Sequence, residues 1–202
     1  MKKYKKEIII FSITSILFII LSLLVVTNKT LTIDTKFHVF ILNIRNDNLN
    51  TIFEYLTNLA SATLLLAISI ILLITMKNKK HSLYILLNLV LAFFSNELAK
   101  SIFNRSRPIG INLIDETGLS YPSGHSMVGL CFYGFITYLL YKKSKKKSQK
   151  IILICSIILI SLTIGFSRIY LGVHYLTDVI GGFLLAIIYL AIYIKLINVE
   201  KK

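Results

Sequence analysis

The segment from Ser167 to Asp178 carries three residues whose types and spacing suit phosphoryl chemistry. Arg168, His174 and Asp178 interrupt a stretch that is otherwise mainly apolar. His174 and Asp178 are four residues apart, so in a helix that begins near residue 173 they lie on one face, one turn from each other. A carboxylate there binds the proton on one ring nitrogen and leaves the other nitrogen as a nucleophile. Arg168 is the cation close by, and a guanidinium suits an oxyanion such as phosphate.

A second polar cluster, between residues 121 and 126, has the composition of a helix start. Pro122 suits a first helical position, and the free N–H groups at a helix N-terminus bind anions. Gly124 lets the backbone approach a ligand closely, and Ser123 adds a hydroxyl donor. His125 stands where it can protonate a departing oxygen. Alone, the cluster is equally consistent with a capped helix start that carries an interfacial histidine.

A third cluster contains Lys100, at the end of an apolar run, and Arg107, in the loop that follows. Taken alone it indicates only a snorkelling lysine with an interfacial arginine. Glu97 precedes Lys100 by three residues, and we expect it to be the ion-pair partner of that lysine. His38 and His81 fall outside all three clusters, and we expect them at the membrane interface.

Long apolar runs separate these clusters. The chain has 202 residues, of which 55% are hydrophobic, and its mean hydropathy is +0.75. A helix that spans a bilayer needs roughly 20 apolar residues. We expect an all-α integral membrane protein, with one domain over residues 1–202 that carries its motifs between residues 100 and 178. The expected transmembrane helices are six, at 8–26, 51–76, 82–103, 122–141, 151–167 and 174–197, with a short interfacial helix within 27–50.

Basic residues are distributed unevenly between the loops. Sixteen of the 23 Lys and Arg residues lie in segments 1–7, 77–80, 142–150 and 195–202. The positive-inside rule assigns these segments, and with them both termini, to the cytoplasm. The three clusters then meet at the outer face of a multi-pass cell-membrane protein. Because the lysines sit between apolar runs, the net charge of +14 indicates membrane orientation and no nucleic-acid partner.

The sequence offers no ligand set for a metal. Its two cysteines, Cys131 and Cys155, each lie inside an expected span, and no disulfide framework or metal-binding spacing can be built from them. The motifs contain no set of His, Cys and carboxylate ligands either. We expect neither a metal nor a cofactor.

Together the three clusters match one signature. Lys-x6-Arg-Pro, Pro-Ser-Gly-His and Ser-Arg-x5-His-x3-Asp occur here complete and in that order. The chain resembles the type 2 phosphatidic acid phosphatase and vanadium haloperoxidase superfamily, and most of all its small bacterial six-span lipid phosphatases. The resemblance implies a metal-independent phosphatase that acts through a phosphohistidine.

The resemblance also implies a role for each matching residue. The nucleophile is His174, the general acid is His125, and the residue that orients the nucleophile is Asp178. The groups that hold the phosphate are Lys100, Arg107, Ser123, Gly124 and Arg168. These roles agree with the residue types, because cations and helix-start amides neutralise charge on the phosphoryl oxygens.

Several functions remain open at this point. The motifs bind only a phosphate, so undecaprenyl diphosphate, phosphatidylglycerophosphate and phosphatidic acid are all candidate substrates at the outer leaflet. A haloperoxidase-like activity is an alternative, although six spans argue against it, since those relatives are soluble. A transporter or proton relay is another, and its ionisable residues would lie near the bilayer midplane rather than at the ends of the spans.

Overall fold

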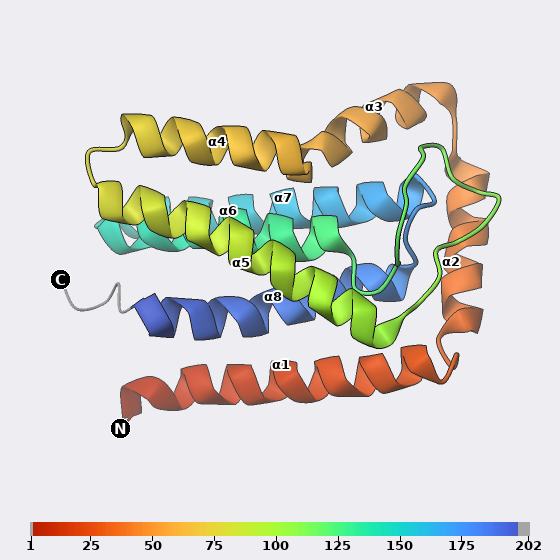
Figure 1. Ribbon diagram of the computed structural model, residues 1–202, viewed down its shortest axis with the longest axis horizontal. Helices are drawn as coiled ribbons and strands as arrows, with labels where there is room; N and C mark the ends of the chain where they lie inside the picture. The colour runs from red at the N-terminus through yellow and green to blue at the C-terminus, as the bar shows by residue number, and fades with distance from the viewer. Residues whose placement is uncertain (1, 198–202) are drawn as a thin grey trace.

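The computed structural model describes residues 2–197, and the side chains from residue 6 onward. Apart from the loop 104–123 and short turns, this part of the chain is helical, without a strand (Figure 1). Its elements are α1 (Lys2–Val26), α2 (Leu31–Ile44), α3 (Asp47–Thr57), the 3-10 helix η1 (Asn58–Ala60), α4 (Ala62–Thr75), α5 (Lys79–Phe103), α6 (Gly124–Lys143), α7 (Lys147–Tyr170) and α8 (Leu176–Ile197). The all-α prediction is confirmed.

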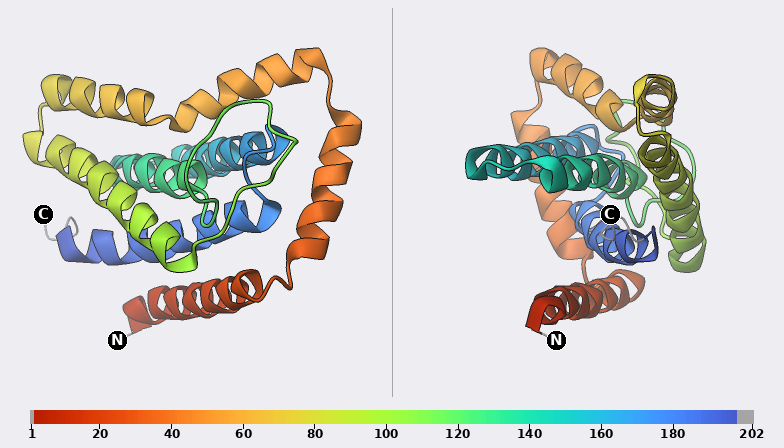
Figure 2. Two further views of the ribbon diagram at one scale, coloured as in Figure 1. Left: turned by 45° about the vertical axis from the view of Figure 1, so that its right-hand side comes forward. Right: turned by 90° about the vertical axis from the view of Figure 1, so that its left-hand side faces the viewer.

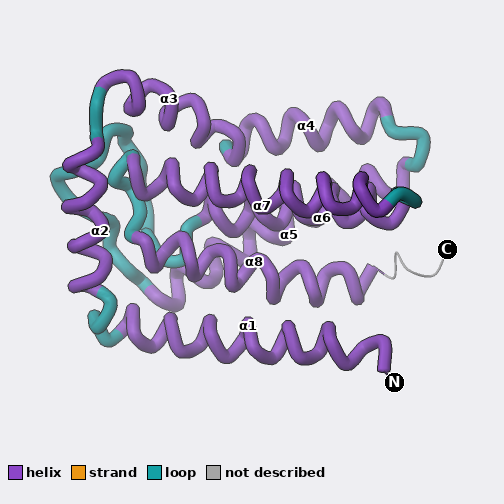
Figure 3. The backbone as a smooth tube through the Cα atoms, turned by 180° about the vertical axis from the view of Figure 1, so that it is seen from behind, coloured by secondary structure: helices purple, strands orange, loops and turns teal. Residues whose placement is uncertain are grey.

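The long helices form a bundle with α6 at its centre. α6 packs against α5, α7 and α8, while α1 packs on the outer side of α8. Figures 1 and 3 show these helices running along the same axis, with α2 crossing one end of the bundle. One face of α6 is completely buried through residues spaced four apart, namely Met127, Cys131 and Phe135.

Large apolar side chains cover the outside of the bundle. Ile8 on α1 is 62% exposed and Leu159 on α7 is 68% exposed, and their neighbours are similar. Such a surface matches lipid rather than water. Among the described residues, α1, α5, α7 and α8 are long and apolar enough to cross a membrane, and the pair α3 and α4 qualifies as a fifth span. α6 does not meet this test, so the six expected spans are only partly accounted for.

The prediction of one continuous helix at 51–76 is wrong, because the structure has two helices there. The chain breaks after Thr57 through η1, and α3 and α4 meet at an angle of 45°. Ser61 starts the second helix, because its side chain accepts a hydrogen bond from the backbone N–H of Leu64 at 3.3 Å. The break brings Thr57 to the interior of the bundle.

The two ends of the bundle differ. The loop 104–123, α2 and the turn between α7 and α8 lie together at one end (Figures 1 and 2). The α4–α5 and α6–α7 connections, which contain lysine-rich segments, lie at the other end together with the start of α1. The predicted segregation of motif residues and lysine clusters to opposite ends of the helices is therefore observed for the described residues, while Lys201 and Lys202 lie outside them.

Close packing of α8 against α6 joins two of the motifs. At Gly182 a Cβ atom would lie 2.8 Å from the carbonyl oxygen of Ser123, so a larger residue would push the helices apart. The backbone N–H of Ser123 donates to the carbonyl oxygen of Asp178 at 3.0 Å. The second motif therefore rests directly on the first turn of α8.

Candidate active site

The third motif folds around the turn between α7 and α8. Arg168 lies in the last turn of α7, and α8 begins only at Leu176. His174 therefore precedes the helix, and the expectation of a helix that starts near residue 173 is wrong. His174 and Asp178 do not face each other across one helical turn, so their contact has another origin.

Asp178 reaches back to His174 as a helix-capping residue. Its Oδ2 accepts hydrogen bonds from the backbone N–H of Tyr175 at 2.8 Å and from the hydroxyl of Ser120 at 2.5 Å. The same oxygen lies 3.4 Å from Nδ1 of His174, and the Ser120 hydroxyl lies 3.3 Å from that nitrogen. The positive end of the helix dipole also stabilises a carboxylate in the first turn. The helix start thus fixes the carboxylate that lies beside Nδ1 of His174.

The second ring nitrogen of His174 faces a cation. Its Nε2 lies 3.2 Å from Nη1 of Arg107. Because a guanidinium can only donate, Nε2 carries the lone pair and Nδ1 carries the hydrogen. Burial outweighs the nearby Asp178 and lowers the pKa of His174 from 6.5 to about 4. The imidazole is therefore neutral near pH 7.

The turn before His174 is held by backbone contacts. Gly172 has a φ of +77°, and a Cβ there would lie 2.3 Å from the carbonyl oxygen of Ile111. Arg45 donates from Nε to the carbonyl oxygen of Tyr170 at 3.0 Å and from Nη1 to that of Ile111 at 2.7 Å. These contacts fix where the chain leaves α7.

Arg107 connects the loop 104–123 to this turn. Its Nη1 donates to the carbonyl oxygen of Val173 at 2.9 Å, Nε donates to that of Gly118 at 3.1 Å, and Nη2 donates to that of Thr117 at 3.0 Å. An arginine with this many backbone acceptors is held in one orientation. The fold of the loop thus places Arg107 beside Nε2 of His174.

Arg168 is the most deeply buried cation of the site, with 1% of its surface exposed. Its Nη1 donates to the hydroxyl of Thr57 at 2.7 Å, and its Nη2 donates to a carboxylate oxygen of Glu116. Its Nε has no hydrogen-bond partner among the described residues. A buried unpaired donor costs about 1–3 kcal/mol, so this N–H is available to a bound anion.

Lys100, in the last turn of α5, lies beside the start of α6. A Cβ atom on Gly124 would come within 3.8 Å of Nζ of Lys100 and within 3.0 Å of Oδ1 of Asn96. The first N–H groups of a helix lack partners within that helix, and here they begin beside an ammonium group. Nζ of Lys100 is also 3.3 Å from Glu97, as predicted.

Ser123 and His125 flank Gly124. The Ser123 hydroxyl is fully buried and accepts a hydrogen bond from the hydroxyl of Ser126 at 3.1 Å. His125 lies in the first turn of α6. The cations Arg168, Lys100 and Arg107 all act on it electrostatically. All eight residues selected from the sequence therefore lie at the same end of the bundle.

Arg105 is the main residue that the sequence analysis did not assign to the site. Its Nη1 donates to Oδ1 of Asp178 at 2.6 Å, and its Nη2 donates to Oδ2 of Asp34 at 2.6 Å. Both carboxylates are completely buried. Arg105 therefore holds the oxygen of Asp178 that faces away from His174. The only feature of the sequence that pointed to a role of Arg105 in the site was its position two residues before Arg107.

Arg105→Lys should lower kcat by about 10- to 100-fold, since a small displacement of a catalytic group has effects of that size. Lysine keeps the charge but cannot bind two carboxylates with one rigid fork. The measurement is kcat together with the melting temperature of the purified protein. Arg45→Lys is the matched control, because Arg45 binds backbone carbonyls at the same end of the bundle. An equal loss of kcat in both variants would contradict a specific role of Arg105.

The helix α2 contributes to the site, although it was predicted only as an interfacial segment. Its buried face carries Asp34 and His38. Asp34 accepts from the backbone N–H of Thr177 at 3.1 Å, and Nε2 of His38 lies 3.2 Å from the carbonyl oxygen of His174. The sequence analysis placed His38 outside the three clusters, and the structure brings its ring against the backbone of His174. The feature of the sequence that could have indicated this contact is the four-residue spacing of Asp34 and His38, which places both on one helix face.

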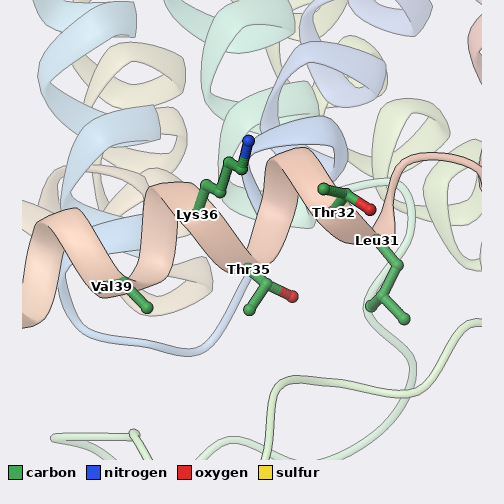
Figure 4. A pocket seen from close by; sticks show the side chains of 5 residues that line it. All are labelled: Leu31, Thr32, Thr35, Lys36 and Val39. Carbon is green, nitrogen blue, oxygen red and sulfur yellow. The ribbon is translucent and has the colours of Figure 1, made fainter.

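The opposite face of α2 is open. Figure 4 shows a hollow there, lined by Leu31, Thr32, Thr35, Lys36 and Val39. None of these residues belongs to a motif.

Within residues 2–197, no group of three or more His, Cys, Asp or Glu side chains could hold a metal ion.

Comparison with known proteins finds a matching family model and similar sequences. The family model of the PAP2 superfamily matches residues 81–202. A phosphatidylglycerophosphatase B from Bacillus subtilis is 32% identical over 176 residues, which cover 85% of this chain and 86% of that protein. An undecaprenyl-diphosphatase from Sulfolobus acidocaldarius is 30% identical over 145 residues, which cover 68% of this chain and 65% of that protein.

Two solved structures share the fold. A transmembrane PAP2-type phosphatidylglycerolphosphate phosphatase from Bacillus subtilis superposes with a TM-score of 0.86 at 30% sequence identity, covering 95% of this chain and 97% of that one. LpxE from Aquifex aeolicus superposes with a TM-score of 0.65 at 27% identity, covering 80% of this chain and 94% of that one.

Proposed function

This chain belongs to the PAP2 superfamily and is a lipid phosphate phosphatase, and we propose that its three motifs form one phosphohydrolase site built around His174. One observation carries the proposal. A neutral, buried imidazole has Asp178 behind Nδ1, at 3.4 Å, and the guanidinium of Arg107 in front of Nε2, at 3.2 Å. A phosphoryl group bound by Arg107 would be adjacent to that lone pair.

In the first step Nε2 of His174 attacks phosphorus, and the bond from phosphorus to the leaving oxygen breaks. His125 gives its proton to that oxygen. Asp178 stabilises the positive charge that develops on the imidazole ring. Lys100, Arg107 and Arg168, together with the N–H groups at the start of α6, neutralise the phosphoryl oxygens.

In the second step water attacks the phosphohistidine, and the phosphorus–nitrogen bond breaks. The same His125, now without its proton, accepts one from the water. Inorganic phosphate leaves, and both histidines return to their initial states. Each proton is thus given and taken by a residue of this chain, without a metal ion.

The substrate is a lipid whose phosphate reaches the end of the bundle. The names of the relatives support two candidates, phosphatidylglycerophosphate and undecaprenyl diphosphate. In both, the lipid tails can remain in the bilayer while the phosphate reaches the end of the bundle that carries the motifs.

The purified protein should release phosphate from a panel of these lipids and of phosphatidic acid, and activity should survive exhaustive chelation. The physical reason is that three side-chain cations supply the charge that a metal would supply. Phosphate release is measured with and without chelator, and orthovanadate should compete as a phosphate mimic. Loss of activity in chelator that divalent metal restores would contradict the mechanism.

The proposed topology has six spans, formed by α1, the bent pair α3–α4, α5, α6, α7 and α8. Both termini and the lysine-rich connections are cytoplasmic, so that the motifs face outward. The separation of lysines and motif residues to opposite ends of the bundle supports this arrangement. α6 is 20 residues long and can cross while surrounded by other helices.

Labelling of single cysteines tests the topology. In a background without Cys131 and Cys155, Ser148→Cys should not react with a membrane-impermeant thiol reagent in intact cells. Asn112→Cys, at an exposed position in the loop 104–123, should react. Both sites should react after the membrane is permeabilised. Labelling of Ser148→Cys in intact cells would place the motifs on the cytoplasmic side.

A further inference from the structure

The carboxylate of Glu116 lies between two arginines of the proposed phosphate site. One oxygen accepts from Nη2 of Arg168, and the other lies 3.5 Å from Nη2 of Arg107. A carboxylate between two guanidiniums occupies the place that a phosphate oxyanion would take. Burial opposes ionisation, but Arg168 and Arg107 together lower the pKa of Glu116 below its ordinary value, so the group is charged.

The backbone around Glu116 is fixed on both sides. Before it, the N–H of Leu113 donates to the carbonyl oxygen of Leu171 at 2.9 Å. After it, Arg107 binds the carbonyl oxygens of Thr117 and Gly118. The Glu116 side chain is 25% exposed, so its carboxylate borders on water. When displaced, its carboxylate thus remains within one side-chain length of the arginines.

We infer that Glu116 is a specificity-determining residue, whose carboxylate is replaced by the substrate phosphate and then disfavours a second phosphate beside the first. The inference rests on the proposed function, because it requires that Arg107 and Arg168 bind phosphate. It implies that the substrate of the site is a lipid phosphate monoester rather than a lipid diphosphate.

Charge balance gives the reason for this preference. Lys100, Arg107 and Arg168 carry three positive charges, and the displaced Glu116 leaves a net charge of two. A phosphate monoester brings at most two negative charges, whereas a diphosphate brings more and places them nearer the carboxylate. Repulsion between close like charges is strong in a partly buried site. A diphosphate therefore binds with lower affinity than the additional contacts of its second phosphate would give by themselves.

The test is equilibrium binding of two ligands that cannot be hydrolysed, methylphosphonate and methylenediphosphonate, to the full chain in detergent. Glu116→Gln keeps the shape of the side chain and removes its charge. The variant should bind methylphosphonate about tenfold more tightly, and methylenediphosphonate about 100-fold more tightly; each tenfold corresponds to about 1.4 kcal/mol. Titration calorimetry measures both dissociation constants.

Asp115→Asn is the matched control, since it removes the same charge at the neighbouring exposed position. It should change either dissociation constant by less than about threefold, as expected for a solvent-screened charge. Unchanged or weaker methylphosphonate binding by Glu116→Gln would overturn the displacement. An equal gain for both ligands would overturn the preference for monoesters. If the wild type bound neither ligand, the proposed phosphate site itself would fail.

Discussion

His125→Ala should still release p-nitrophenol from p-nitrophenyl phosphate in a rapid burst, and should then stall with phosphate attached to His174. The p-nitrophenolate ion is a weak base and leaves without a proton, so the first step barely needs His125. The second step needs a base to activate water, and the variant has lost it. Steady-state turnover should fall by about 10²- to 10⁴-fold, the usual contribution of a general acid or base.

The size of the defect in the first step should depend on the leaving group. A glycerol alkoxide is strongly basic and needs the proton, so a phosphatidylglycerophosphate should react slowly even in a single turnover. Rapid-quench kinetics on several substrates, with detection of an acid-labile phosphohistidine, measures both steps. The structure supports this division of roles, because His125 is at the start of α6 while His174 is paired with Asp178.

His174→Ala is the matched variant. It should lose turnover of every substrate by at least about 10⁴-fold, because no residue replaces the nucleophile. It should form neither a burst nor a phosphoenzyme. A burst in His174→Ala would show that the nucleophile is assigned wrongly. Equal loss of the first step for all leaving groups in His125→Ala would show the same for the general acid.

Asp178→Asn should fold and lose about 10³- to 10⁴-fold in kcat, as expected when a carboxylate that orients a catalytic histidine becomes an amide. The amide can donate to the imidazole and favour the wrong tautomer, and it no longer stabilises the imidazolium. Folding should survive because Arg105 keeps its second carboxylate partner, Asp34, at 2.6 Å. The measurements are kcat and the melting temperature of the purified variant.

Asp34→Asn provides the control, because it removes the other carboxylate from the same guanidinium. The two variants should have similar melting temperatures, while Asp34→Asn should lose only about tenfold in kcat through a small displacement of Arg105. Near-wild-type turnover in Asp178→Asn would mean that the contact between His174 and Asp178 serves only the fold.

The sequence by itself determined where most of the long apolar helices lie and which residues meet at one end of them. Apolar runs of about 20 residues are a local property of the chain, and so is the spacing within each motif. Lys100 at the end of α5, Gly124 at the start of α6 and Arg168 at the end of α7 could all be placed by counting from the ends of those runs. The lysine clusters marked the opposite end in the same way.

Only the tertiary structure decided how these residues are held. Asp34 and Arg105 are separated by 71 residues, and Thr57 and Arg168 by 111. Such pairs depend on which helices pack together, and periodicity within a helix carries no information about that. The tertiary structure also decides that α8 starts at Leu176. The chain must first turn at Gly172, close to Ile111, before the helix can begin.

The position of Glu116 illustrates the same limit. In the sequence it is one of two adjacent acidic residues in a polar loop, with nothing to distinguish it from Asp115. In the structure the loop is held by Arg107, and this contact directs the carboxylate of Glu116 to the buried guanidinium of Arg168. A buried cation requires a counter-charge, and which acidic residue provides it depends on the path of the folded chain.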